Sequence, residues 1–95
     1  MKIALNRSYS AFSLSKEARN DLNIGNKYDY YTDYLKRTDE KLISLIEEKG
    51  TEYVSGIYAR IIVAYVPEPI TDYRIDDHDG FETITYVIDG KLYQF

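Results

Sequence analysis

The chain has 95 residues, of which 44% are hydrophobic and 29% charged, and its formal net charge is −4. This length suits one domain, residues 1–95, with a single modest core, and the composition excludes the low-hydrophobicity, high-charge class of disordered proteins. The sequence contains no cysteine, which excludes disulfides and thiolate metal sites and favours a reducing compartment.

The N-terminal segment predicts a strand followed by a helix. The apolar run from Lys2 to Leu5 is too short for a signal peptide, and no later run approaches the roughly 20 residues of a membrane span, so we expect a cytoplasmic protein. A helix should follow because Ser13 or Ser15 can cap it and Glu17 then lies in its first turn. The stripe that would pack this helix on a sheet is Leu14, Ala18 and Leu22.

The tyrosine-rich segment 28–35 fits two patterns. Tyr28 and Tyr31 have the spacing of a helix, whereas strand alternation joins Tyr28, Tyr30, Thr32 and Tyr34. The aromatic and threonine content favours a strand, on which Tyr31 points away from the other tyrosines.

Capping residues at both ends predict a second helix. Thr38 or Asp39 can cap the N-terminus, the helix should run to about Lys49, and Gly50 occupies the C-cap position. Its apolar stripe consists of Leu42, Ile43, Leu45 and Ile46.

The most apolar stretch of the chain predicts the central strand. It runs from Ile57 to Val66, is rich in β-branched and aromatic residues, and is bounded by Gly56 and Pro67. Because both of its faces are apolar, we expect both to be covered, with Arg60 near an edge.

The C-terminal third predicts three antiparallel strands. Tyr73 and Ile75 alternate with polar residues, and Asp79-Gly80 suits a turn. A strand from Phe81 to Ile88 should then lead through Asp89-Gly90 into a last strand, 91–95. The resulting fold class is α+β: a small antiparallel or mixed sheet of four to six strands with two helices on one face and a C-terminal β-hairpin.

The sequence offers little catalytic chemistry. Its one histidine, His78, lies among carboxylates that favour the protonated form, opposite to what a general base needs at neutral pH. A calcium-binding loop in its best register would use Asp77 and Asp79 correctly. It would also place Ile75 and Tyr86 where the first and the bidentate ligands are required. We therefore expect no enzyme, no metal site and no cofactor.

Charge and aromatic content point to binding instead. From Glu68 onward there are seven acidic residues against Arg74 and Lys91, which disfavours nucleic acid and attracts a basic protein. The chain also has eleven tyrosines, a residue type enriched at protein interfaces. The predicted protein-binding residues are Asp76, Asp77, Asp79, Tyr28, Tyr30, Tyr31 and Tyr34. The alternative is an acidic face that only keeps the protein soluble, with tyrosines at the rim of the sheet.

Four groups of residues are similar to those of other small proteins. They are Lys2-Ile3-Ala4-Leu5-Asn6 with Phe12-Ser13-Leu14-Ser15-Lys16-Glu17-Ala18; Arg37-Thr38-Asp39 with the helix through Glu47-Glu48; Ser55-Gly56 with Tyr58-Ala59; and Asp77, Asp79-Gly80 and Glu82-Thr83-Ile84. In these the chain resembles a group of small uncharacterised proteins encoded in bacteriophages and prophages. Members usually carry Gly-Gly at Ser10-Ala11 and Pro at Glu40. The resemblance implies a phage setting in a bacterial host and a shared fold, and it implies no activity.

Three functions follow as hypotheses. The first is a non-catalytic binder that inhibits or redirects a host protein, of the anti-defence type, for example a CRISPR effector inhibitor. The second is a sponge for a nucleotide-like signal, held by tyrosines and Arg60 or Arg74 at a subunit interface. The third is an assembly module that forms a homo-oligomer through a sheet edge.

Overall fold

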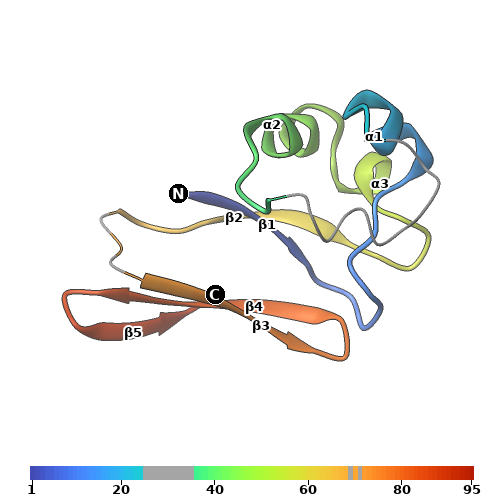
Figure 1. Cartoon of the computed structure of the whole chain (residues 1–95). Helices are drawn as coiled ribbons and strands as arrows, with labels where there is room; N and C mark the ends of the chain where they lie inside the picture. Colours follow the sequence, from blue (N-terminus) through green and yellow to red (C-terminus); the bar gives the residue numbers. More distant parts are fainter. Residues whose placement is uncertain (25–35, 69, 71) are drawn as a thin grey trace.

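The structure, a computed structural model, describes residues 1–24, 36–68, 70 and 72–95. In chain order its elements are β1 (Lys2–Asn6), α1 (Lys16–Asp21), α2 (Glu40–Lys49), α3 (Thr51–Val54), β2 (Ile61–Tyr65), β3 (Asp72–His78), β4 (Phe81–Ile88) and β5 (Lys91–Gln94). Figure 1 shows them in three layers, which are the helices, the β1–β2 pair and the β3–β4–β5 sheet. The predicted α+β class is confirmed.

The strands form two antiparallel sheets rather than the single sheet that we expected. β1 pairs with β2, and β3, β4 and β5 form a separate sheet in that order. The helices cover one face of the β1–β2 pair and the three-stranded sheet covers the other (Figure 1). Both faces of this pair are apolar, so each requires a covering layer, and the C-terminal strands supply the second one.

The two predicted helices begin where their capping residues predict, and α2 also ends at its predicted C-cap. α1 is shorter than its apolar stripe predicts, because it ends at Asp21 and leaves Leu14 and Leu22 outside the helix. The Ser15 hydroxyl accepts the amide of Ala18 at 3.0 Å at the start of α1, and the Asp39 carboxylate accepts the amide of Leu42 at 3.0 Å at the start of α2. Gly50 is the C-cap of α2, with a φ of 93° that suits glycine. The short helix α3, which the sequence did not predict, begins directly after it.

The strand that we expected to begin at Ile57 begins only at Ile61. The amide of Ala59 donates to the carbonyl of Gly56 at 3.1 Å and closes a turn before β2. Ile57 is 92% exposed and Tyr58 77% exposed, so neither belongs to the core. Among the described residues β2 pairs with β1 alone, which makes it an edge strand rather than a central one.

Two apolar cores hold the three layers together. The core between the helices and the β1–β2 pair consists of Ala4, Leu14, Ala18, Leu42, Ile43, Leu45, Ile46, Val54 and Ile61. The core between the two sheets consists of Ile3, Leu5, Ala64, Val66 and Ile84. Successive side chains of a strand point to opposite faces, which explains why β1 contributes to both cores.

Both predicted hairpin turns are confirmed. Asp79-Gly80 joins β3 to β4 and Asp89-Gly90 joins β4 to β5. All four residues have positive φ, with 55° and 95° in the first turn and 51° and 77° in the second. Two-residue turns of this kind match the twist of the strands that they connect, and Asp-Gly is a favoured pair in them.

The predicted tyrosine strand, 28–35, lies outside the described residues and stays a prediction. No helix in the described part of the chain combines the length and the apolar character needed to cross a membrane.

Candidate binding surface

Asn6 lies at the end of β1, has no exposed surface and connects three loops. Its Nδ2 donates to the carbonyl oxygens of Ser10 and Gly80, the latter at 2.9 Å. Its Oδ1 accepts the amide of Arg60 at 2.9 Å. A buried amide side chain is stable only when its polar atoms have partners, so these contacts fix the loop after β1, the turn before β2 and the β3–β4 turn relative to one another.

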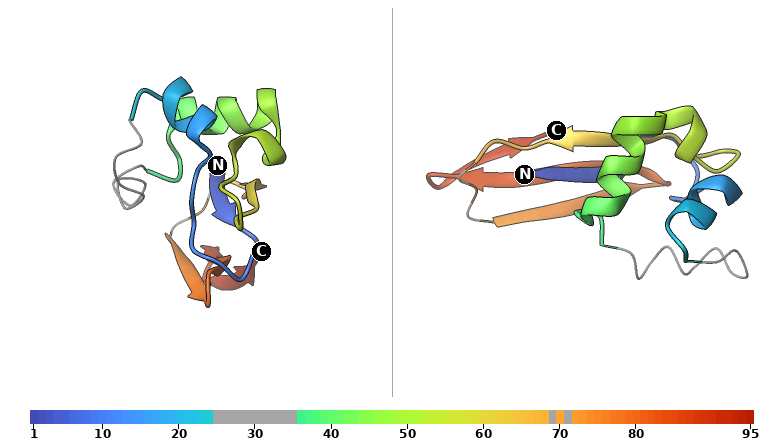
Figure 2. Two further views of the ribbon diagram at one scale, coloured as in Figure 1. Left: turned by 90° about the vertical axis from the view of Figure 1, so that its right-hand side faces the viewer. Right: turned by 90° about the horizontal axis from the view of Figure 1, so that it is seen from above.

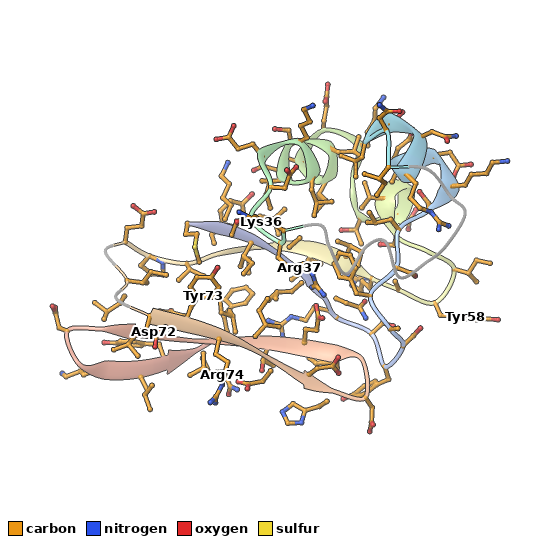
Figure 3. All side chains as sticks on the ribbon, in the orientation of Figure 1. Lys36, Arg37, Tyr58, Asp72, Tyr73 and Arg74 are labelled. Atoms are coloured by element: carbon orange, nitrogen blue, oxygen red, sulfur yellow. The ribbon has the colours of Figure 1, made fainter. Side chains whose placement is uncertain are left out.

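An ion pair between Arg37 and the buried Glu82 stabilises the backbone around Asn6. Glu82 on β4 is 4% exposed and meets Arg37 at 2.6 Å from Nη1 to Oε1 and at 2.9 Å from Nη2 to Oε2. Its Oε1 also accepts the amide of Asn6 at 2.7 Å. The guanidinium lies 3.7 Å from the ring centroid of Phe12, and Figure 3 shows Arg37 between the two sheets. Two parallel hydrogen bonds join the guanidinium to the carboxylate, and the amide of Asn6 adds a third, so both charges have partners.

Gly80 brings the β3–β4 turn against the loop after β1. Its φ is 95°, and a Cβ at this position would overlap the backbone of Ser10. Glycine is therefore required both by the backbone conformation and by the space available. This close approach completes one end of the molecule, formed by residues 7–10, 56–60 and 79–80, which we call the three-loop end.

Large apolar side chains point into solvent at the three-loop end. Tyr9, Ile57 and Tyr58 are 78%, 92% and 77% exposed. Tyr9 comes from the loop after β1, whereas Ile57 and Tyr58 come from the turn before β2, and the hydroxyl of Ser8 donates to the carbonyl of Tyr58 and joins these two loops directly. Figure 3 shows Tyr58 pointing away from the molecule, at the end opposite the β4–β5 turn. Each of these side chains thus lies on backbone that the buried contacts hold in place.

Aromatic contacts extend this end onto the three-stranded sheet. The rings of Tyr9 and Phe81 stack with their centroids 5.2 Å apart. The guanidinium carbon of Arg7 lies 5.2 Å from the Phe81 centroid and 5.1 Å from that of Phe95. The loop after β1 therefore packs on strands β4 and β5 through an aromatic stack and cation–π contacts rather than through buried aliphatic side chains.

The structure places the predicted acidic residues in three different environments. Asp76 forms an ion pair with Arg74 at 2.8 Å, on the sheet itself. Asp77 accepts the amide of Gly80 at 2.7 Å and so stabilises the turn. Asp79 occupies the exposed first position of that turn. The β3–β4 turn therefore brings Asp77 and Asp79 to the three-loop end, whereas Asp76 lies farther along β3.

The exposed tyrosines of the described ranges include two at the three-loop end that the sequence did not predict for binding. The four tyrosines of the segment 28–35 lie outside the described residues. Tyr9 and Tyr58 were not among the predicted binding residues, and Tyr58 had been assigned to a buried strand. The signal that could have identified it is Ser55-Gly56, a turn-forming pair directly before the apolar run.

The side chains considered for metal or nucleotide binding lie apart from one another in the described ranges. They contain no group of three or more His, Asp or Glu side chains that could hold a metal ion. Arg60 and Arg74, the cations considered for a nucleotide-like ligand, lie in separate shallow grooves of about 320 and 240 Å³. The second of these also contains Leu92. The described residues of one copy thus do not bring these two arginines to a common pocket.

The residues that carry the phage-protein resemblance meet in this region. Asn6, Phe12, Arg37, Gly80 and Glu82 come from three of its four groups and share the contacts described above. Comparisons of the chain with protein-family models, with curated proteins and with solved structures gave no significant match. The phage setting therefore stays a prediction from the resemblance.

Proposed function

We propose that this chain is a non-catalytic, phage-type accessory protein that binds a host protein through its three-loop end. The single observation that carries the proposal is the exposure of Tyr9, Ile57 and Tyr58 on loops that are hydrogen-bonded to one another and to a buried asparagine. Large apolar side chains that stay in solvent on a fixed backbone have the composition of a protein-binding surface.

Preorganised loops favour binding for a thermodynamic reason. A flexible loop loses conformational freedom when it docks, and this loss weakens the complex. The contacts of Asn6 and the Arg37–Glu82 pair restrict the loops before any partner arrives. Binding residues are often found on loops that a rigid scaffold positions in this way.

The acidic β3–β4 turn and the net charge of the chain favour a basic partner. Asp79 lies in the exposed turn and Asp77 lies beside it near the end of β3, whereas Arg7 and Arg60 are cations on the other two loops; the chain as a whole carries a net charge of −4. A basic protein surface would be attracted and nucleic-acid phosphates would be repelled. The resemblance to phage proteins motivates the choice of a host protein, such as a defence protein or CRISPR effector, that this chain would inhibit or redirect.

The test is capture of a partner from bacterial host lysate with the tagged full chain, followed by mass spectrometry of all copurifying proteins and small molecules. We compare wild type with the double variant Ile57→Ser/Tyr58→Ser. Tyr65→Ser is the matched control, because Tyr65 is also an exposed tyrosine but lies on β2 near the chain's N-terminus. We expect one host protein with wild type and with the control, and recovery at least about tenfold lower with the double variant.

Two results would contradict the proposal. Equal recovery of the host protein by the double variant would place the contact elsewhere on the molecule. Recovery of a nucleotide-like small molecule without any protein would support the sponge hypothesis instead.

A further inference from the structure

The outward backbone groups of β5 can be identified from its pairing with β4. Phe95 and Ile84 exchange both backbone hydrogen bonds, at 2.8 and 3.1 Å. In an antiparallel pair the residues that face the neighbouring strand alternate, so Tyr93 and Lys91 also direct their backbone toward β4. Leu92 and Gln94 direct their N–H and C=O groups away from it. Within the described residues β5 pairs with no other strand.

On the other flank of the molecule, several outward groups of the edge strands have partners. The amide of Ala4 on β1 donates to the carbonyl of Arg37 at 2.7 Å, and the amide of Asn6 donates to Glu82 at 2.7 Å. On β3, the amide of Tyr73 donates to the carboxylate of Asp72 at 2.9 Å. Such contacts and charged edge residues prevent another strand from pairing.

β5 lacks this protection. The segment from Leu92 to Phe95 carries no charged side chain, and Leu92 is 73% exposed. β3, the other edge of the same sheet, has four charged residues between Asp72 and Asp77. Figure 2 shows β5 and β2 on one side of the molecule and β3 on the opposite side. The open edge is therefore confined to one flank, which the helices leave uncovered.

A row of tyrosines crosses the sheet and ends at this edge. Tyr73, Tyr86 and Tyr93 lie directly opposite one another on β3, β4 and β5. The rings of Tyr86 and Tyr93 stack with centroids 5.5 Å apart and an interplanar angle of 17°. Tyr93 is still 44% exposed, because no further strand covers its outer side. Aromatic cross-strand pairs stabilise sheets, so a strand that continued this row would be favoured.

We propose that β5 pairs with β5 of a second copy of this chain, antiparallel and about a two-fold axis at Tyr93. In this register Leu92 of each copy exchanges its outward backbone hydrogen bonds with Gln94 of the other copy. Tyr93 then lies opposite Tyr93 of the second copy as a close, non-hydrogen-bonded pair, which continues the tyrosine row through both sheets. No like charges meet between Leu92 and Phe95, so the self-pairing is compatible with the acidic net charge.

This inference goes beyond the proposed function, because it concerns a different surface. The three-loop end includes the β3–β4 turn, whereas β5 begins at the β4–β5 turn at the opposite end of β4 and approaches the three-loop end at Phe95, whose ring centroid lies 5.1 Å from the guanidinium carbon of Arg7. A dimer through β5 would present two three-loop ends and could bind a multivalent partner with higher avidity. Either proposal can therefore be refuted by its own experiment while the other one stands.

The test measures the mass of the full chain by sedimentation from low micromolar to millimolar concentration. We expect a shift from the 11.1 kDa of one chain toward twice that value as the concentration rises. Gln94→Pro removes the outward amide and keeps the backbone bonds to β4, although it loses the side-chain hydrogen bond from Nε2 to the hydroxyl of Thr83, which Gln94→Ala loses as well. It should raise the dissociation constant of the dimer about tenfold or more. Gln94→Ala keeps the amide and should dimerise like wild type.

Amide hydrogen exchange of the wild type tests the interface without a variant that could misfold. The amides of Leu92 and Gln94 should exchange fast at low concentration and become protected as the dimer forms, whereas those of Ile84 and Phe95 should be protected throughout. A mass that stays at 11.1 kDa at every concentration would overturn the proposal. So would a dimer in which the Leu92 and Gln94 amides remain unprotected, because another surface would then form it.

Discussion

Gly80 and Gly90 hold the same position in two similar turns, but only Gly80 meets a distant part of the chain. Both have positive φ, at 95° and 77°. A Cβ on Gly80 would overlap the backbone of Ser10, whereas nothing lies within 4 Å of a Cβ on Gly90. The first turn is therefore fixed by a tertiary contact and the second by its own conformation.

This difference predicts unequal effects of the same substitution. Gly90→Ala should lower the free energy of unfolding by about 1 kcal/mol, the cost of a left-handed conformation with a side chain. Gly80→Ala adds a steric overlap and should lower it by about 3 kcal/mol. Urea denaturation of the two variants measures the difference. Equal losses would mean that the loop after β1 moves aside without cost.

At the scale of elements, the Arg37–Glu82 pair connects β4 with β1 and with the segment before α2. Glu82→Gln keeps the shape of the side chain but removes its charge, so the partly buried Arg37 loses its counter-ion. We expect the free energy of unfolding to fall by about 3 kcal/mol, because breaking a buried pair on one side leaves an uncompensated charge. The measurement is urea denaturation at neutral pH.

The matched control for that variant is Glu47→Gln. Glu47 also pairs with a cation, Lys2 at 3.0 Å, but at the surface between α2 and β1. Hydrogen bonds from Tyr65 and from Lys2 lower the pKa of Glu47, so its carboxylate is ionised at neutral pH. Solvent and salt screen this exposed pair, and its loss should leave the urea midpoint nearly unchanged. If both variants behave alike, the Arg37–Glu82 contact does not hold the two sheets together.

Elements with local signals were predictable from the sequence, and those that depend on distant contacts were not. Ser15, Asp39 and the two Asp-Gly pairs fix the helix starts and hairpins through interactions within a few residues. The division into two sheets was missed, because apolar runs show that a face is covered without showing by which strand. Ile57 was assigned to a strand because it opens the same apolar run as β2, whereas the turn closed by Gly56 and Ala59 leaves it exposed.

The candidate site was predictable only in part. The exposed turn at Asp79 follows from its sequence, so its place on the surface was expected. The role of Asn6 was not, because its partners Ser10, Arg60 and Gly80 lie in loops whose meeting is a property of the whole fold. An asparagine at the end of a strand carries no sequence pattern that distinguishes a buried connector from a solvent-exposed residue.

At the scale of the whole molecule, the fold is elongated and its two ends are distinct. The principal extents are 42, 26 and 21 Å. The three-loop end combines exposed apolar side chains with the acidic β3–β4 turn, whereas the opposite end of β4 carries a similar Asp-Gly turn that lies away from the loops 7–10 and 56–60 (Figure 1). The β4–β5 turn can therefore serve as a control for the β3–β4 turn when the binding proposal is tested.

The most direct test of that proposal is the affinity of the captured host protein for Asp79→Asn and for Asp89→Asn. Each substitution removes one negative charge, and asparagine tolerates the positive φ of 55° at one site and 51° at the other. We expect Asp79→Asn to weaken binding about threefold at low salt, with the difference disappearing at high salt, and Asp89→Asn to bind like wild type. Equal affinity of both variants and wild type would contradict a charge contribution from the β3–β4 turn, and a loss confined to Asp89→Asn would contradict recognition at the three-loop end.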